Sequence, residues 1–332
     1  MPFVRLTQVN GSRKCALTVK RDSVEGFHVA AAGVDMSPRM RTGARVRRAP
    51  GNTFFNPCPD GRRATVPAQG AAPMPHRAPH REAVMQAKRV AFVTGGMGGL
   101  GAAISRRLHD AGMAVAVSHS ERNDHVSTWL MHERDAGRDF KAYAVDVADF
   151  ESCERCAEKV LADFGKVDVL INNAGITRDA TFMKMTKGDW DAVMRTDLDA
   201  MFNVTKQFIA GMVERRFGRI VNIGSVNGSR GAFGQANYAS AKAGIHGFTK
   251  TLALETAKRG ITVNTVSPGY LATAMVEAVP QDVLEAKILP QIPVGRLGRP
   301  DEVAALIAFL CSDDAGFVTG ADLAINGGMH MS

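Results

Sequence analysis

The sequence predicts an α/β fold with a doubly wound parallel sheet, formed by residues 85–332 as a single domain behind an extension of residues 1–84. Short apolar segments rich in β-branched residues alternate with amphipathic stretches along this domain, which is the pattern of βαβ units. A glycine-rich turn also stands between the first such segment and the first amphipathic stretch. No apolar run of about 18 residues occurs, so the sequence argues against a membrane-spanning helix.

The predicted elements follow one another in regular alternation. The first strand covers residues 89–94, and the first helix runs from about 99 to 112, where Gly112 suits the position after a helix end. Further strands are expected at 114–118, 140–144, 167–171, 219–223, 262–266 and 322–325. Helices are expected at about 124–136, 150–164, 237–259 and 301–312, with a long helical stretch between the strands at 167–171 and 219–223.

The formal net charge of +8 is unevenly distributed. Residues 1–84 hold 14 Lys+Arg and 5 Asp+Glu, whereas residues 85–332 hold 27 and 28. Nine of the 14 prolines also precede residue 85, and this part shows little periodicity. We therefore predict a basic, low-complexity, disordered extension and a nearly neutral domain.

Several interpretations of the extension compete. A nucleic-acid-binding arm is disfavoured because its basic residues are scattered and only Phe54 and Phe55 offer stacking surfaces. Its Pro and Gly content argues against the helix of a transit peptide, and no charged start leads into the apolar core of a secretory signal. A plain extension fits best, and the native protein is then expected to begin at Met85 or Gln86. We expect neither nucleic acid nor a membrane as a partner.

The glycine-rich turn reads Thr94-Gly95-Gly96-Met97-Gly98-Gly99-Leu100-Gly101. Glycines let the chain turn tightly and let backbone N–H groups approach a pyrophosphate, and the helix N-terminus behind them favours an anion. An ordinary flexible loop is the alternative, but the position between a strand and a helix favours a dinucleotide site. The residues expected to bind the cofactor here are Gly95, Gly96, Gly99, Leu100 and Gly101.

The end of the second strand indicates which dinucleotide binds. Sites specific for NAD place Asp or Glu there, whereas this chain has Ser118-His119-Ser120 followed by Glu121 and Arg122. An acidic residue at the strand end would repel a 2′-phosphate, and Ser118, Ser120 and Arg122 are possible donors to one. The sequence therefore favours NADPH, with NADH as the alternative because Glu121 is close by.

A tyrosine and a lysine form the candidate catalytic pair. In Tyr238-Ala239-Ser240-Ala241-Lys242 the phenol and the ammonium lie on one face of a helix. A cation close to a phenol favours the phenolate and makes the phenol a better proton donor. Ser225 follows a strand at the edge where such sheets bind ligands, so its hydroxyl is suited to hold a substrate carbonyl. The alternative is an ordinary pair on a surface helix.

Taken in order, these motifs resemble the short-chain dehydrogenase/reductase family over about residues 88–332, and the resemblance does not include the extension. It rests on Thr94-Gly95, Gly99, Gly101, Asn172-Asn173-Ala174-Gly175, Ser225, Tyr238, Lys242 and Pro268-Gly269. The resemblance implies a Rossmann fold, a nicotinamide cofactor and a homotetramer.

The resemblance also implies roles for single residues. Tyr238 would donate a proton to the substrate carbonyl, Lys242 would bind the cofactor ribose and assist Tyr238, and Ser225 would orient the carbonyl. Further cofactor contacts are expected from Asp146, Val147, Asn173, Ala174, Gly175, Pro268, Gly269 and Thr273.

One position departs from the family pattern. The family usually has asparagine in a Thr-Asn-Leu setting, where it holds a water in a proton relay behind the lysine, but this chain reads Thr196-Asp197-Leu198. An ionised aspartate accepts hydrogen bonds but does not donate them. We therefore expect Asp197 in the catalytic relay with an altered pH dependence or a reduced activity. A non-catalytic dinucleotide-binding sensor is the corresponding alternative.

Within the family, residues 173–179 resemble the 3-oxoacyl thioester reductases, and residues 225–228, 233–235, 267–270 and 326–331 resemble the bacterial acetoacetyl-CoA reductases. This implies reduction of acetoacetyl-CoA by NADPH to (R)-3-hydroxybutyryl-CoA for polyhydroxybutyrate synthesis. The 3-oxoacyl-[acyl-carrier-protein] reductase of fatty-acid synthesis is the alternative. The expected substrate contacts are Ser225, Phe233, Gln235, Tyr238 and Tyr270, although Phe233 and Tyr270 also suit simple lid packing.

The cysteines argue against a metal or a disulfide framework. Cys153 and Cys156 form a C-x-x-C, but on a helical pattern with no second pair or matching histidine, so we expect no metal. Five scattered cysteines in a chain of this length favour a reducing compartment, and we expect a cytoplasmic protein.

Overall fold

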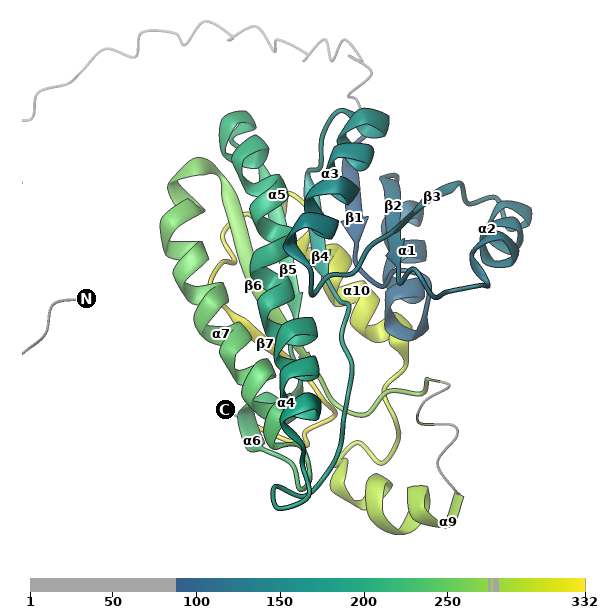
Figure 1. Cartoon of the computed structure of the whole chain (residues 1–332), viewed down its shortest axis with the longest axis vertical. Helices are drawn as coiled ribbons and strands as arrows, with labels where there is room; N and C mark the ends of the chain where they lie inside the picture. Colours follow the sequence, from purple (N-terminus) through teal and green to yellow (C-terminus); the bar gives the residue numbers. More distant parts are fainter. Residues whose placement is uncertain (1–87, 274–275, 277–280, 332) are drawn as a thin grey trace, which may run out of the picture. The chain divides into compact units, whose positions relative to one another are not determined.

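The computed structural model describes residues 88–273, 276 and 281–331. Figure 1 shows how the helices and strands of this part are arranged. The extension of residues 1–84 lies outside the described residues, so its predicted disorder and the boundary at residue 85 stay predictions.

Seven strands form one parallel sheet (Figure 1). In chain order they are β1 (Val90–Val93), β2 (Ala114–His119), β3 (Phe140–Ala144), β4 (Val169–Asn172), β5 (Gly218–Ile223), β6 (Ile261–Pro268) and β7 (Asp322–Ile325). Their order in the sheet is β3-β2-β1-β4-β5-β6-β7, and every neighbouring pair runs parallel. The predicted doubly wound sheet is confirmed.

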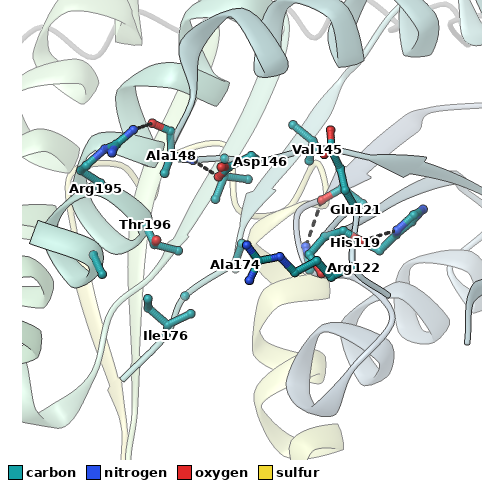
Figure 2. A pocket seen from close by; sticks show the side chains of 16 residues that line it. His119, Glu121, Arg122, Val145, Asp146, Ala148, Ala174, Ile176, Arg195 and Thr196 are labelled. Atoms are coloured by element: carbon teal, nitrogen blue, oxygen red, sulfur yellow. Dashed lines mark hydrogen bonds between the residues drawn. The ribbon is translucent and has the colours of Figure 1, made fainter. Parts of the chain in front are cut away.

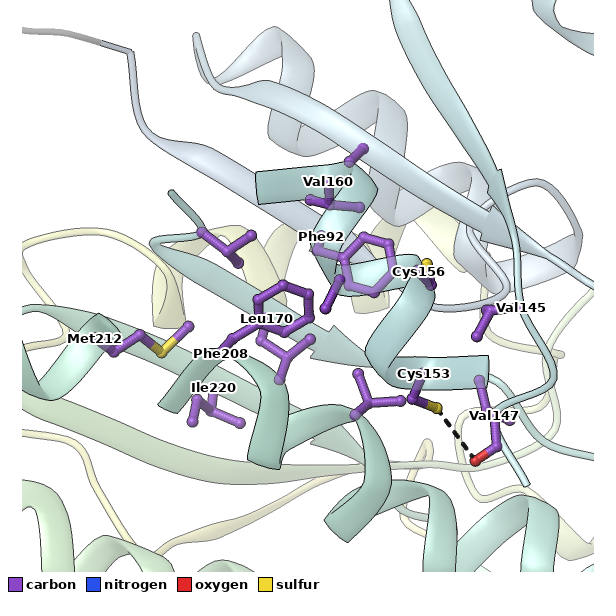
Figure 3. Packing of buried hydrophobic residues seen from close by; sticks show 14 of the residues in the cluster. Phe92, Val145, Val147, Cys153, Cys156, Val160, Leu170, Phe208, Met212 and Ile220 are labelled. Atoms are coloured by element: carbon purple, nitrogen blue, oxygen red, sulfur yellow. Dashed lines mark hydrogen bonds between the residues drawn. The ribbon is translucent and has the colours of Figure 1, made fainter. Parts of the chain in front are cut away.

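Helices cover both faces of the sheet, because successive side chains of a buried strand point to opposite faces. In β1, Val90 and Phe92 belong to one hydrophobic core, and Ala91 and Val93 to the other. The first core lies under α3 (Phe150–Phe164), α5 (Ala200–Arg215) and α7 (Ala236–Thr256) (Figure 3). The second lies under α1 (Gly99–Asp110), α2 (Val126–Asp135) and α10 (Pro300–Leu310).

The long helical stretch predicted before β5 is interrupted. It consists of α4 (Lys187–Val193), a π-helical turn at Met194–Asp199, and α5. Thr186 caps α4 by accepting a hydrogen bond from the backbone N–H of Asp189. A π-helical turn adds a residue to the helical repeat and re-aims the side chains around it, often at a functional site. Here the turn carries Asp197, whose side chain is fully buried.

Two further regions differ from the prediction. A short helix, α6 (Val226–Arg230), follows β5, and α9 (Gln281–Val283) continues as a π-helical turn at Leu284–Ile288 and a 3₁₀ turn at Leu289–Gln291. Neither segment is long enough to show a clear apolar period, which is why the sequence pattern did not indicate them.

The strand order reverses between β1 and β4, which are neighbours although two strands separate them in the chain. The backbone N–H of Thr94, directly after β1, donates to the carbonyl of Ile171 in β4 at 3.0 Å. In open α/β sheets, ligands bind outside the carboxyl ends of the strands at such a reversal point. The fold therefore places the glycine-rich turn and the segment after β4 where a ligand is expected.

Candidate active site

The glycine-rich turn packs too tightly for side chains. Gly95 and Gly99 have φ of +60° and +47°, which residues with a Cβ atom rarely adopt. A Cβ atom on Gly101 would lie 2.1 Å from the carbonyl oxygen of Gly95. The N-terminus of α1 is thereby held directly against the turn, leaving backbone N–H groups and the positive end of the helix dipole for an anion.

Thr94 ties this turn to the segment after β4. Its hydroxyl oxygen accepts hydrogen bonds from the backbone N–H groups of Asn173 and Ala174, at 2.9 and 3.0 Å. The Asn173 side-chain amide in turn donates to the carbonyl of Thr94 at 2.9 Å. The two segments predicted to contact the cofactor therefore form one rigid unit.

A pocket of about 690 Å³, which we call the outer pocket, opens beside this unit (Figure 2). Among the predicted cofactor residues it is lined by Gly95, Ser118, Arg122, Asp146, Val147, Ala174 and Gly175. Further lining residues that were not among the predicted cofactor contacts include Ala148, Ile176, Ala192, Arg195 and Thr196.

A second pocket of about 470 Å³, the inner pocket, continues from the outer one, because both are lined by Gly95, Ala174, Gly175 and Ile176. Its predicted lining residues also include Gly99, Leu100, Gly101, Asn173, Asp197, Tyr238, Lys242 and Thr273. Three predicted cofactor residues, Gly96, Pro268 and Gly269, line neither pocket. The two pockets form an elongated site over the glycine-rich turn, which fits a dinucleotide.

Ser118 and Arg122, at the end of β2, differ in how far they are exposed to a ligand in the outer pocket. The Ser118 side chain is only 1% exposed, and its hydroxyl accepts a hydrogen bond from the backbone N–H of Gly95 at 3.1 Å. Ser118 therefore supports the glycine-rich turn from beneath. Arg122 is exposed on the wall of the outer pocket and is the cation at this strand end (Figure 2).

Tyr238 and Lys242 lie one turn apart on α7 and both line the inner pocket. The Lys242 ammonium is 5.5 Å from the centre of the Tyr238 ring. Its side chain is buried and donates to the carbonyl of Ile223, the last residue of β5, at 3.0 Å. The ammonium is thus fixed near the phenol, which is the arrangement that favours proton donation by a tyrosine.

Asp197 is the second partner of Lys242, with its Oδ2 3.2 Å from Nζ. Its Oδ1 accepts a hydrogen bond from the backbone N–H of Ile176 at 2.8 Å. Burial raises the pKa of this carboxyl above its ordinary value, against the opposing attraction of Lys242 and the hydrogen bond from Ile176. A Cβ atom on Gly175 would lie 2.8 Å from Oδ2, so the glycine at that position makes room for the carboxylate.

Ser225 caps α6 at the carboxyl end of β5. Its side-chain oxygen accepts a hydrogen bond from the backbone N–H of Asn227 at 3.1 Å, and the residue is 8% exposed. Ser225 does not line the inner pocket, but the preceding Gly224 does. The serine therefore lies beside the pocket and keeps its hydroxyl proton for a ligand.

A third pocket, of about 430 Å³, gathers three predicted substrate residues, Phe233, Gln235 and Tyr270, together with Arg230 and Asp179. Phe233 is 94% exposed, so it presents an apolar surface without a packing partner in the described part of the chain. Gln235 is fixed on both sides of its amide: it donates to Asp179 and accepts from Asn227, both at 2.9 Å. The wall of this pocket is therefore partly apolar and partly polar.

The two helical cysteines are buried in the first core (Figure 3). Burial raises the pKa of Cys153 to about 12 and that of Cys156 to about 11, so both thiols stay protonated and unreactive near neutral pH. Among the described residues, no group of three or more His, Cys, Asp or Glu side chains is placed to hold a metal ion. No helix in that part is long and apolar enough to cross a membrane.

Comparison with known proteins shows the family to which the chain is similar. A family model described as enoyl-(acyl carrier protein) reductase matches residues 95–330. The chain is 55% identical over 244 residues to an acetoacetyl-CoA reductase of Cupriavidus necator, which covers 74% of this chain and 99% of that protein. It is 52% identical over 246 residues to an acetoacetyl-CoA reductase of Shinella zoogloeoides, with 72% and 98% covered. It is also 45% identical over 250 residues to the 3-oxoacyl-[acyl-carrier-protein] reductase FabG of Haemophilus influenzae, with 75% and 100% covered.

Proposed function

The chain belongs to the short-chain dehydrogenase/reductase family and is an oxidoreductase, and we propose that it reduces acetoacetyl-CoA to (R)-3-hydroxybutyryl-CoA with NADPH. The observation that carries the proposal is the Tyr238–Lys242 pair on the wall of an elongated pocket built on a glycine-rich turn. The names of its relatives supply the substrate. The product suits polyhydroxybutyrate synthesis, which we propose as the pathway.

The preference for NADPH is supported by the end of β2. Arg122 lines the outer pocket there, and the strand itself ends in Ser118 and His119 rather than in an acidic residue. A guanidinium group at this position suits a 2′-phosphate, because its planar donors match phosphate oxygens. Glu121 lines the same pocket, and its carboxylate is the feature that would favour NADH.

When bound, NADPH supplies the hydride for the carbonyl carbon. Tyr238 donates its phenolic proton to the carbonyl oxygen, and Lys242 stabilises the phenolate that this leaves. Ser225 donates a hydrogen bond that orients the carbonyl. Asp197 balances the charge of Lys242 at the inner end of the site. Phe233, Gln235 and Tyr270 hold the acyl part of the substrate in the third pocket.

A carrier-protein thioester is the second candidate substrate, and the 45% identity to the Haemophilus influenzae reductase favours it. We propose in addition that the enzyme is a cytoplasmic homotetramer, and that residues 85–332 form the catalytic domain.

A steady-state assay tests the substrate and the cofactor together. Initial rates are measured for acetoacetyl-CoA and for acetoacetyl-[acyl-carrier-protein], each with NADPH and with NADH. The proposal predicts the highest kcat/KM for acetoacetyl-CoA with NADPH. A higher kcat/KM for the carrier-protein thioester would assign the chain to fatty-acid synthesis, and dinucleotide binding without turnover of either thioester would support the sensor alternative.

A further inference from the structure

Arg195 lies on the wall of the outer pocket opposite Arg122, and none of the sequence motifs includes it (Figure 2). It belongs to the π-helical turn at Met194–Asp199, whose next residue, Thr196, lines the same pocket. The turn then contributes Asp197 to the inner pocket. One irregular helical turn therefore supplies residues to both halves of the elongated site.

The guanidinium of Arg195 lies along the pocket wall, where it contacts a backbone carbonyl and not a carboxylate. Its Nη2 donates to the carbonyl of Ala148 at 3.4 Å, across 47 residues of sequence. Among the salt bridges within residues 88–273, 276 and 281–331, neither Arg195 nor Arg122 has an acidic partner. Two exposed cations without such a partner thus face one pocket from opposite sides.

The two arginines stand at different places along the outer pocket, so they would meet different parts of a bound dinucleotide. Arg122 stands at the end of β2, where a ribose 2′-phosphate is expected. Arg195 instead contacts Ala148 and lines the pocket together with Asp146, which the family resemblance implies as the residue that meets the adenine. A guanidinium plane stacks on the face of a nucleobase, and such a contact strengthens as water is excluded.

We propose that Arg195 is a cofactor-binding residue that covers the adenine face of the dinucleotide, with Ala148 holding its guanidinium at the pocket wall. This inference rests on the proposed use of a nicotinamide dinucleotide and adds a contact that is shared by NADPH and NADH. Arg122, in contrast, distinguishes the two cofactors.

Binding titrations without substrate test this assignment. The fluorescence of NADPH and of NADH is followed during titration with the wild-type protein and with Arg195→Ala, Arg195→Lys and Arg122→Ala. Arg195→Ala is expected to raise both Kd values by the same factor, about tenfold for a partly desolvated cation–π contact. Arg195→Lys should raise both Kd values by a smaller factor, because lysine keeps the cation–π attraction but loses the planar stacking. Arg122→Ala should weaken NADPH binding alone.

The control is Arg155→Ala, an exposed arginine on α3 that lines neither pocket, which should leave both Kd values unchanged. Reduced nicotinamide mononucleotide, which lacks the adenosine, should bind Arg195→Ala and the wild type equally. An Arg195→Ala protein that binds both dinucleotides normally, or that loses affinity for NADPH only, would overturn the inference. Failure of the wild-type protein to bind either dinucleotide would instead count against the proposed function.

Discussion

Asp197 and Lys242 form a buried ion pair, with Oδ2 and Nζ 3.2 Å apart, at the inner end of the pocket that Tyr238 lines. The Asp197 side chain is fully buried and that of Lys242 nearly so, and Lys242 is the cation whose attraction opposes the effect of burial on the pKa of the carboxyl. The family resemblance implies a neutral asparagine at this position, where this chain has an aspartate. A titratable carboxyl therefore lies next to the lysine that accompanies Tyr238, the residue that we propose as the proton donor.

The first prediction concerns the pH dependence of catalysis. Because burial raises the pKa of Asp197, its carboxyl becomes protonated on acidification earlier than an exposed one, and Lys242 then loses its counterion. We expect kcat/KM of the wild type to decrease as the pH is lowered. This decrease should be absent from the pH profile of Asp197→Asn. Asp199→Asn, an exposed change in the same turn, should keep the wild-type profile. An identical acid limb in Asp197→Asn would contradict the assignment.

The second prediction concerns a different buried carboxylate. Glu133 on α2 is fully buried and accepts hydrogen bonds from Arg106 on α1 at 2.9 Å and from Arg138 at 2.7 Å. Burial alone would raise its pKa, but the two arginines outweigh burial and lower it below its ordinary value of 4.5. Its stabilising contribution is therefore present at neutral pH and is lost as pH falls below that value.

Replacing Glu133 by Gln should accordingly lower the free energy of unfolding at pH 7 by about 3 kcal/mol. This value is at the low end of the range for breaking a buried ion pair, because both arginines are partly exposed. Urea unfolding at several pH values measures this. The deficit relative to the wild type should shrink toward pH 3. If the difference in unfolding free energy between the variant and the wild type does not depend on pH, Glu133 acts through packing instead. The control is Glu158→Gln, on the exposed side of α3.

The third prediction concerns the glycine-rich turn. Gly101→Ala should abolish dinucleotide binding, because the new Cβ atom would lie 2.1 Å from the carbonyl oxygen of Gly95 and push α1 away from the turn. Gly247→Ala on α7 is the control, since a Cβ atom there has no neighbour within 4 Å and the residue lines neither the outer nor the inner pocket. A fluorescence titration with NADPH compares the two. Equal loss of affinity in both variants would refute the steric argument.

Most of the fold followed from the sequence because its signals are local. The apolar β-branched runs marked every strand of the sheet, and Gly112 adopts φ of +88° beyond α1 as expected of a residue after a helix end. The π-helical turn at Met194–Asp199 was missed, because an extra residue inside a helix leaves no mark on composition. Its position depends on packing against α4, α5 and α7.

The site was predicted where a motif carries it and missed where it depends on tertiary contacts. Tyr238, Lys242 and Asp197 share one pocket, as the motif and its single departure suggested. Arg195 was missed because only the π-helical turn and the bond to Ala148 bring it to the outer pocket. Ser118 was expected as a phosphate donor, and in the structure its hydroxyl also supports Gly95 from below, a contact between residues 23 positions apart.

The central claim is that Tyr238 is the proton donor of an NADPH-dependent acetoacetyl-CoA reductase. The most direct measurement is the initial rate of NADPH oxidation with acetoacetyl-CoA, for the wild type and for Tyr238→Phe at equal concentrations of NADPH-binding sites. We expect rapid turnover by the wild type and a loss of about 10²–10⁴-fold in Tyr238→Phe, as for removal of a general acid, with NADPH affinity unchanged. Retained turnover in Tyr238→Phe, or no turnover in the wild type, would contradict it.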